Sequence, residues 1–210
     1  MELLGTVASI WRYPIKSLHF EALGEAELTL EGLPGDRAAA LFVQAGHARA
    51  GNTYRGKEHN RLHLTGAAED ALAMAAERGV RVELKAEPAK RYFDAAPVSV
   101  LLDRWVGEVE KHLGYCLDPL RWRPNFYVRT EPGTASSEAD LCGREITIGT
   151  AVLRVRSGIK RCVTPTYDVT DGTSEPEILD YVARRRDNVM GIYCDVVRAG
   201  FVREGDALRL

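Results

Sequence analysis

Cys162 differs from the other cysteines of this sequence in the polar and charged residues that flank it. It directly follows Lys160 and Arg161 and precedes Thr166 and Asp168. A thiol binds metals or attacks a substrate as the thiolate, and neighbouring cations favour that form. Burial as a small inert hydrophobe is the usual state of a lone cysteine, but these neighbours make it a poor description here. The segment therefore predicts an accessible, chemically competent thiol.

Two further motifs offer cations at places where the chain turns. Lys16 and Ser17 follow a proline that ends the first predicted strand, and an ammonium beside a hydroxyl suits a phosphate. A solvated loop lysine is the plainer alternative. Arg37 directly follows a Pro-Gly-Asp turn, and its side chain either pairs with Asp36 or faces an anionic ligand.

A third motif places Arg123 and Asn125 at the start of a strand, next to Trp122. The arginine offers a planar fork of donors, and the amide offers both a donor and an acceptor. The tryptophan either stacks on a flat ring or covers the core, and the core is favoured. If these groups and Lys16, Arg37 and Arg161 converge on the thiolate, they form a pocket for a polyanionic cofactor that also holds a soft metal.

Short β-like runs bounded by Gly and Pro must position these motifs. They are residues 4–11, 26–30, 39–44, 80–84, 98–102, 126–128, 145–148, 152–156, 192–197 and 207–210. Helices are predicted at 67–78, from an Asp103 cap to Gly114, and from a Ser174–Glu177 capping box. Many strands, few helices and no β–α–β alternation predict a mainly β fold with some α: a barrel with helical excursions.

Composition excludes several function classes. The net charge of −2 over 210 residues gives no overall field for nucleic acid or a membrane surface. The start of the chain resembles no signal sequence, and no apolar run approaches ~18 residues. The four cysteines show no C-x-x-C spacing, which argues against a zinc site and a disulfide framework and predicts a reducing, cytoplasmic setting. No dinucleotide fingerprint, P-loop or H-E-x-x-H motif is present. Of the four cysteines, Cys194 and Cys116 are expected to be buried, and Cys142 exposed.

In this order, the motifs resemble the MOSC family, named for the C-terminal domain of molybdenum-cofactor sulfurase, which includes the mitochondrial amidoxime-reducing components. The matching pieces are Tyr13–Ser17, Gly35–Arg37, Arg123–Asn125, Ile146–Gly149, Arg161–Asp168 and Gly205–Asp206. The resemblance covers nearly the whole chain. It implies a MOSC-associated β-barrel-like region at 1–95 and a MOSC domain at 96–210, possibly as one intertwined unit, with the boundary near residues 85–96.

The resemblance implies binding of the molybdenum cofactor, molybdopterin with its metal, with Cys162 as the molybdenum ligand. It places the family's cofactor contacts on Lys16, Ser17, Arg37, Arg123 and Asn125, to which Arg161 and Thr166 are added. Asp168 is a candidate for orienting ligands or moving protons, or else a loop cap.

The implied activity is reduction of an N-hydroxylated small-molecule substrate, with electrons from a separate donor protein. The chain is shorter than the amidoxime-reducing members around residues 83–98 and lacks the cysteines of a fused iron–sulfur domain. The alternatives are a non-catalytic carrier of the cofactor, or of sulfur on Cys162, and an interaction module in which Cys162 is incidental.

Overall fold

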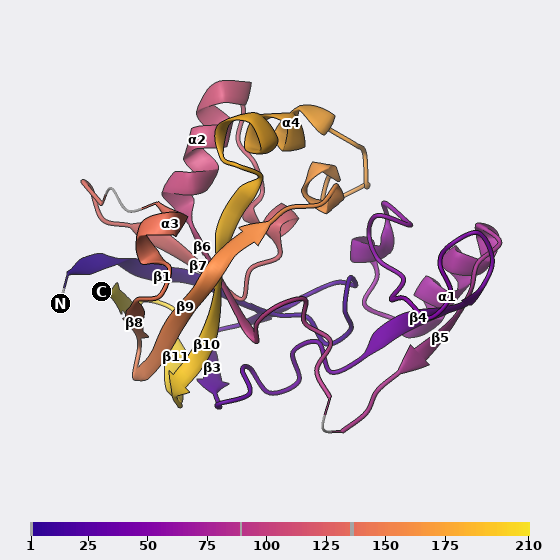
Figure 1. The fold of residues 1–210 in the computed structure, drawn as a ribbon, viewed down its shortest axis with the longest axis horizontal. Helices are drawn as coiled ribbons and strands as arrows, with labels where there is room; N and C mark the ends of the chain where they lie inside the picture. The colour runs from indigo at the N-terminus through magenta and orange to yellow at the C-terminus, as the bar shows by residue number, and fades with distance from the viewer. Residues whose placement is uncertain (1, 89, 135–136) are drawn as a thin grey trace.

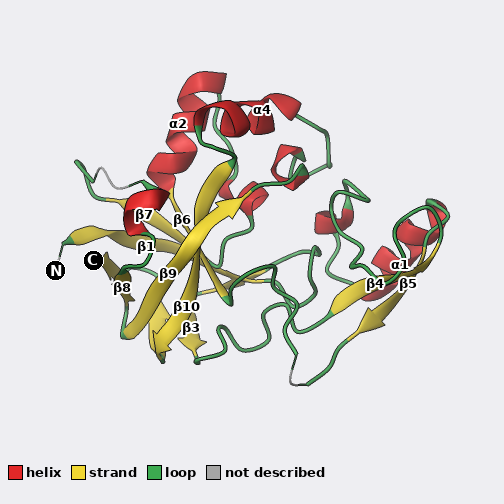
Figure 2. Cartoon of the chain, in the orientation of Figure 1, coloured by secondary structure: helices red, strands yellow, loops and turns green. Residues whose placement is uncertain are grey.

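Seven strands close into a barrel in the computed structural model, which describes residues 2–88, 90–134 and 137–210 (Figures 1 and 2). The order around it is β12 (Ala207–Arg209), β8 (Glu145–Ile148), β9 (Ala151–Lys160), β10 (Val189–Arg198), β6 (Val98–Leu102), β7 (Phe126–Thr130) and β1 (Leu3–Arg12). Pairing of β12 with β1 closes the ring, and β2 (Glu21–Leu23) pairs antiparallel with the end of β1. A separate pair joins β3 (Glu25–Leu28) to β11 (Gly200–Arg203).

The barrel is filled by alternating apolar side chains, as the period of two in its strands requires. On β10, Ile192 and Cys194 are fully buried and Val196 nearly so, whereas Tyr193 and Asp195 lie on the other face. The prediction that Cys194 is a core residue is confirmed. Tyr193 therefore lies on the outer face of the barrel.

The fold class predicted from the sequence is confirmed, with one difference in topology. Strands β6 and β7 are parallel neighbours joined by helix α2 (Asp103–Leu113), so one β–α–β crossover exists where none was expected. Asp103 does not cap α2, because Leu102 holds the N-cap position. The Asp103 carboxylate instead accepts hydrogen bonds from the amide and hydroxyl of Thr130, at 2.9 and 2.6 Å.

The second capping prediction is also wrong. Helix α4 (Pro176–Arg185) begins at Pro176 with no side-chain cap, because proline is favoured in the first helical turn, where its missing N–H costs nothing. A capping box does occur in the short helix α3 (Glu138–Leu141), between Ser137 and Asp140. The sequence analysis missed α3 because one turn of helix leaves no apolar period.

A small lobe packs beside the barrel and has a core of its own. It consists of β4 (Ala40–Ala45), β5 (Arg81–Lys85), α1 (Ala68–Glu77) and the short 3₁₀ helix η1 (Leu62–Leu64), on the right in Figure 1. Leu41, Tyr54 and Leu62 are buried in that core. Two hydrogen bonds hold the lobe to the barrel side: Asn60 Nδ2 donates to the Gly172 carbonyl at 2.8 Å, and a bond of 2.7 Å joins His63 Nε2 to the Asp168 carbonyl.

Both halves of the chain contribute to the closed barrel, since β1 lies between β7 and β12. The predicted division near residues 85–96 stays a prediction, and residue 89 in that segment lies outside the described residues. Among the described helices, none combines the length and apolar character needed to cross a bilayer.

Candidate functional site

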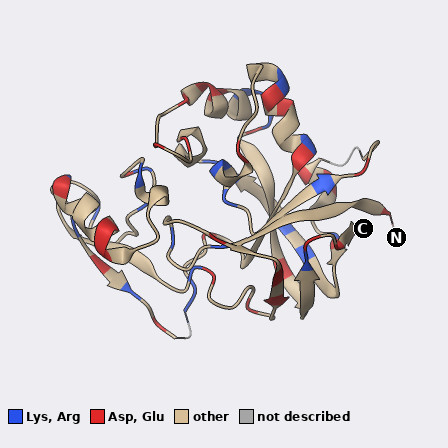
Figure 3. Ribbon diagram, turned by 180° about the vertical axis from the view of Figure 1, so that it is seen from behind, with Lys and Arg blue, Asp and Glu red and all other residues tan. Residues whose placement is uncertain are grey.

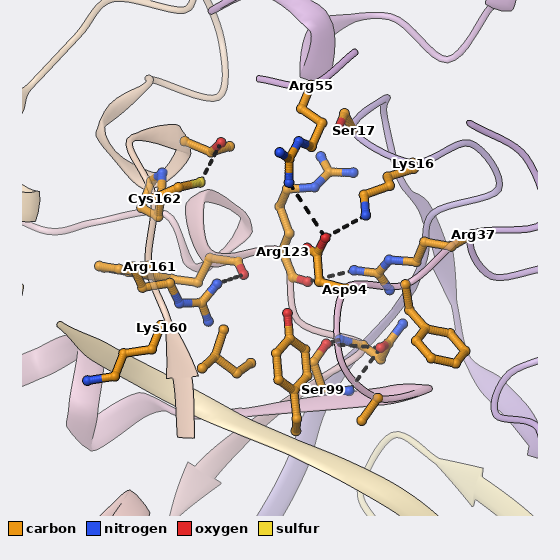
Figure 4. A pocket seen from close by; sticks show the side chains of 18 of the residues that line it. Lys16, Ser17, Arg37, Arg55, Asp94, Ser99, Arg123, Lys160, Arg161 and Cys162 are labelled. Atoms are coloured by element: carbon orange, nitrogen blue, oxygen red, sulfur yellow. Dashed lines mark hydrogen bonds and ion pairs between the residues drawn. The ribbon is translucent and has the colours of Figure 1, made fainter. Parts of the chain in front are cut away.

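A pocket of about 330 Å³ opens where the loops of the small lobe face the outer surface of the barrel (Figure 4). Its lining includes Ser99 of β6, Ile159 of β9 and Tyr193 of β10, and Ser99 pairs with Tyr193 in register. The other lining side chains come from residues 16–17, residue 37 and the segments 55–57, 92–96, 121–125 and 160–165. The volume lies within the ~300–1,000 Å³ range of small-molecule sites.

The pocket is strongly basic although the whole chain is nearly neutral. Among the described residues that line it are eight cations and a single carboxylate, Asp94; the cations are Lys16, Arg37, Arg55, Lys57, Arg121, Arg123, Lys160 and Arg161. Figure 3 shows basic residues on the loops between the small lobe and the barrel. Such an imbalance favours a ligand that carries several negative charges.

Seven of the nine predicted site residues line this one pocket: Lys16, Ser17, Arg37, Arg123, Asn125, Arg161 and Cys162. The structure thus brings together motifs separated by almost 150 positions in sequence. Thr166 and Asp168 are not in the lining. The roles of all nine in binding or catalysis stay predictions.

One end of the pocket holds the Asp94 carboxylate among cations. Lys16 Nζ lies 2.5 Å from Asp94 Oδ1, and Arg55 Nη1 lies 3.9 Å from the same oxygen. Burial alone would raise the pKa of Asp94, but the charge and hydrogen bond of Lys16 outweigh it, and the pKa is lowered. The carboxylate therefore stays ionised and marks the position that another anion would find favourable.

Arg37 and Arg123 both contact the buried ring of Tyr13, with guanidinium carbons 4.4 and 4.2 Å from its centroid. Arg37 pairs with Asp36 at 2.6 Å, so the predicted local pairing occurs, yet Arg37 still lines the pocket. Arg123 has no carboxylate partner among the ion pairs of the described residues. Burial, together with the nearby charge of Arg37, lowers the pKa of Arg123 to about 10. A bound anion would relieve this repulsion.

Three of these residues have left-handed backbone conformations that side chains other than glycine rarely adopt. Ser17, Arg37 and Arg123 have φ angles of +73°, +44° and +54°. Such conformations cost on the order of 1–3 kcal/mol each and concentrate at binding sites. Their coincidence in one pocket supports a functional use of these three side chains.

At the opposite end of the pocket, Cys162 is exposed, and its Sγ lies 3.2 Å from Thr164 Oγ1 (Figure 4). The small lobe reaches this loop too, since a Cβ on Gly56 would lie 2.9 Å from Thr164 Oγ1. No histidine lines the described part of the pocket, so a thiol–histidine pair is not formed there. Lys160 points away, and its Nζ donates to the Asp187 carbonyl at 2.5 Å.

The expectations for two other cysteines have opposite outcomes. Cys142 is exposed, as predicted. Cys116 is exposed as well, so its predicted burial is wrong. It lies just beyond Gly114, which ends α2 in a left-handed conformation, and the chain there has left the helix face that packs on the core.

Asn125 lines the pocket floor, but its side chain joins three segments of the protein. Its Oδ1 accepts from the Ser99 amide and hydroxyl at 3.0 and 2.9 Å, and its Nδ2 donates to the Trp11 carbonyl at 3.2 Å. The neighbouring Trp122 is buried, as favoured from the sequence, and its Nε1 has no hydrogen-bond partner.

Replacing Asn125 with alanine is expected to destabilise the fold by about 3 kcal/mol, because it leaves buried polar groups of Ser99 and Trp11 unpaired. The melting temperature should fall by roughly 6–12 °C. Calorimetry checks this, with exposed Asn52→Ala as the matched control. A shift as small as that of the control would contradict the assigned role.

Thr166 and Asp168 stabilise the loop after Cys162 from outside the pocket. Thr166 is buried, and its hydroxyl donates to the Val163 carbonyl at 2.8 Å. Asp168 accepts from the Thr170 amide at 2.8 Å and pairs with Arg121 at 2.6 Å. Hydrogen bonds from Thr170, with the charge of Arg121, lower the pKa of Asp168. Of the two roles considered for Asp168, these contacts support that of a loop cap.

Asp168→Asn is expected to lower the free energy of unfolding by about 1–2 kcal/mol at neutral pH. The lowered pKa of Asp168 means that its stabilisation is present above the ordinary pKa of 3.8 and is lost as the pH falls through the folded value. The difference from wild type should therefore shrink between about pH 5 and pH 3 in denaturant titrations. Exposed Asp180→Asn is the control, and a difference that does not change with pH would argue against this account.

The pocket residues that sequence reasoning missed include Arg55, Lys57, Asp94 and Tyr193. The Arg-Gly-Lys sequence at 55–57 could have indicated a basic loop at the site, since it places a cation on either side of a flexible residue. Asp94 lies in the segment that was interpreted as a domain boundary. Burial raises the pKa of Tyr193, whose hydroxyl stays protonated at neutral pH.

Comparison with known proteins gives matches over nearly the whole chain. The family model described as "MOSC domain" matches residues 88–209, and "MOSC N-terminal beta barrel domain" matches residues 4–111. No curated protein matches. The crystal structure of YuaD from Bacillus subtilis is similar, with a TM-score of 0.59, 16% identity, and coverage of 97% of this chain and 93% of that one. YiiM from Escherichia coli gives a TM-score of 0.46 and 13% identity over 100% and 69% of the two chains.

Proposed function

Because the chain belongs to the MOSC family, and MOSC domains are associated with the molybdenum cofactor, we propose that the basic pocket binds molybdopterin with its metal. The observation that carries the proposal is the accessible Cys162 thiol in a cavity whose opposite end is lined by Lys16, Arg37, Arg55 and Arg123. A phosphate needs the cations, and a soft metal needs the thiolate. Few other ligands need both.

The donor set of the pocket fits this group. Within residues 2–88, 90–134 and 137–210, no three His, Cys, Asp or Glu side chains gather as a metal site. A metal at Cys162 would thus take its other donors from the bound group, as a pterin dithiolene allows. Arg123, which has no carboxylate partner among the ion pairs of the described residues, lies along the cavity, where an anionic ligand would pair with it.

We assign Lys16, Ser17 and Arg123 to the phosphate end, with Arg37 and Arg55 adding positive charge, and Cys162 to the metal end. When bound, the cofactor would supply two-electron redox chemistry. The chain's own residues fix its orientation, limit water at the cavity floor through Ile159 and Trp122, and hold a proton on the Tyr193 hydroxyl. Figure 4 shows the cation cluster and the thiol on opposite sides of one cavity.

The activity we propose is reduction of an N-hydroxylated compound. That reaction breaks the N–O bond, consumes two electrons and two protons, and releases water. A separate donor protein would supply the electrons. The second candidate function is carriage of the cofactor, or of sulfur on Cys162, without catalysis. The exposed thiol supports this function as strongly as it supports reduction of a substrate.

Turnover of a hydroxylamine or an amidoxime by cofactor-loaded protein with a chemical reductant separates the two functions. Amine or amidine formation that disappears in Cys162→Ser supports the oxidoreductase. Fully loaded protein without turnover, or a persulfide on Cys162, would identify a carrier.

A further inference from the structure

We propose that Arg161 is a positioning residue that fixes the Cys162 loop, and that it does not bind the cofactor. The inference rests on the proposed function, because it concerns how the thiol end and the phosphate end of that site are held at a fixed distance from each other. It departs from the expectation that every arginine of the motifs contacts the ligand. The proposal is based on the contacts that the Arg161 guanidinium makes.

The Arg161 guanidinium is already engaged by backbone carbonyls on two sides. Its Nε donates to the Met190 carbonyl at 2.7 Å, and Nη2 donates to the same oxygen. Its Nη1 donates to the Trp122 carbonyl at 2.8 Å, and the group also lies 5.6 Å from the Trp122 ring centroid. Three of its five N–H groups are therefore taken by the protein, through a fork that lysine cannot imitate.

The acceptor segment, residues 122–125, is also held by Arg37, Tyr13 and Trp11. Arg37 Nη2 donates to the Arg123 carbonyl at 3.2 Å, and the Tyr13 hydroxyl donates to the Pro124 carbonyl at 3.1 Å. The Trp11 amide donates to the Asn125 carbonyl at 2.8 Å. Four consecutive carbonyls thus join the thiol loop, the Arg37 turn and β1. This segment sets the distance between the thiol and the cation cluster.

The neighbouring turn completes the clamp on the thiol loop. Asn188, with φ +60°, donates from Nδ2 to the Arg161 carbonyl at 2.8 Å and accepts from the Arg161 amide at 3.0 Å through its own carbonyl. Gly191, with φ +84°, leaves room for the guanidinium, since a Cβ there would lie 3.2 Å from Arg161 Nη2. The backbone before Cys162 is therefore fixed from both sides.

The test compares Arg161→Lys with Arg123→Lys in protein without cofactor; both variants keep the charge. For Arg161→Lys we expect hydrogen exchange of the amides of residues 161–167, other than Pro165, to become about tenfold faster, with inorganic phosphate affinity within twofold of wild type. Arg123→Lys should do the reverse, with phosphate binding weakened about tenfold and exchange unchanged. A loss of phosphate affinity in Arg161→Lys with normal exchange would overturn the proposal. Undetectable phosphate binding by wild type would count against the proposed function, while the exchange result still decides this inference.

Site-resolved alkylation with iodoacetamide distinguishes positioning from general destabilisation. In Arg161→Lys the alkylation rate of Cys162 should rise at least threefold relative to that of Cys116, and buried Cys194 should stay protected. Equal acceleration at Cys194 would indicate a merely structural role and overturn the proposal. If Arg161→Lys does not fold, Asn188→Gly keeps the left-handed turn and removes one contact to the loop. It should accelerate exchange at 161–167, and unchanged exchange would contradict the clamp.

Discussion

Cys162→Ser is expected to lose molybdenum while retaining pterin, when wild type and variant are purified from a host that makes molybdopterin. The thiol lies at one end of the pocket, and the cations that would hold the phosphate lie at the other (Figure 4). A serine hydroxyl is a much poorer ligand for a soft metal. The molybdenum-to-protein ratio should fall at least about tenfold, a loss like those measured when metal-site residues are changed.

Stability should not change in this variant, because Cys162 is exposed. Cys142→Ser is the matched control: it is also exposed and lies outside the pocket, so metal and pterin content should both equal those of wild type. Full molybdenum content in Cys162→Ser would remove Cys162 as the metal ligand.

Arg123→Met is expected to weaken anion binding strongly without lowering the stability of the empty protein. Burial lowers the pKa of Arg123 to about 10, and its neighbour Arg37 repels it. Its Nη2 donates a hydrogen bond to the Leu18 carbonyl at 2.6 Å. Replacing a buried charge by an apolar side chain is often neutral or stabilising. Losing its charged hydrogen bonds to a phosphate should cost about 3 kcal/mol, roughly a hundredfold in affinity.

Thermal unfolding with and without inorganic phosphate measures both effects at once. The variant should unfold at or above the wild-type temperature when phosphate is absent, and phosphate should not raise that temperature. Arg129→Met, which removes an exposed arginine from β7, should behave as wild type in both conditions. Wild-type phosphate affinity in Arg123→Met would exclude Arg123 from the anion site.

The barrel and most site residues could be predicted because their signals are local. Alternation on β10, the proline after Tyr13, and the turn at Gly35 each specify where the chain is buried or leaves the sheet. The β–α–β crossover was not visible, since neighbouring strands in sequence give no sign of whether they pair in parallel. The Ser174 capping box failed because Pro176 competes for the helix start.

The distribution of roles within the pocket needed three-dimensional structure. Arg123 and Arg161 look equivalent in sequence, each in an Arg-rich turn near an apolar strand. Only the fold shows that Arg161 contacts the carbonyls of Met190 and Trp122, whereas Arg123 has few partners. Tyr193 lies in the pocket because of the register of its strand, and Asp94 because of the path of its loop. A local sequence motif indicates neither.

The most direct test of the central claim is the molybdenum and pterin content of the wild-type protein, purified from a host that makes molybdopterin. Metal analysis, combined with pterin fluorescence after oxidation, should give both in nearly equal amounts. Well-folded protein that contains neither would contradict cofactor binding as the function of this pocket.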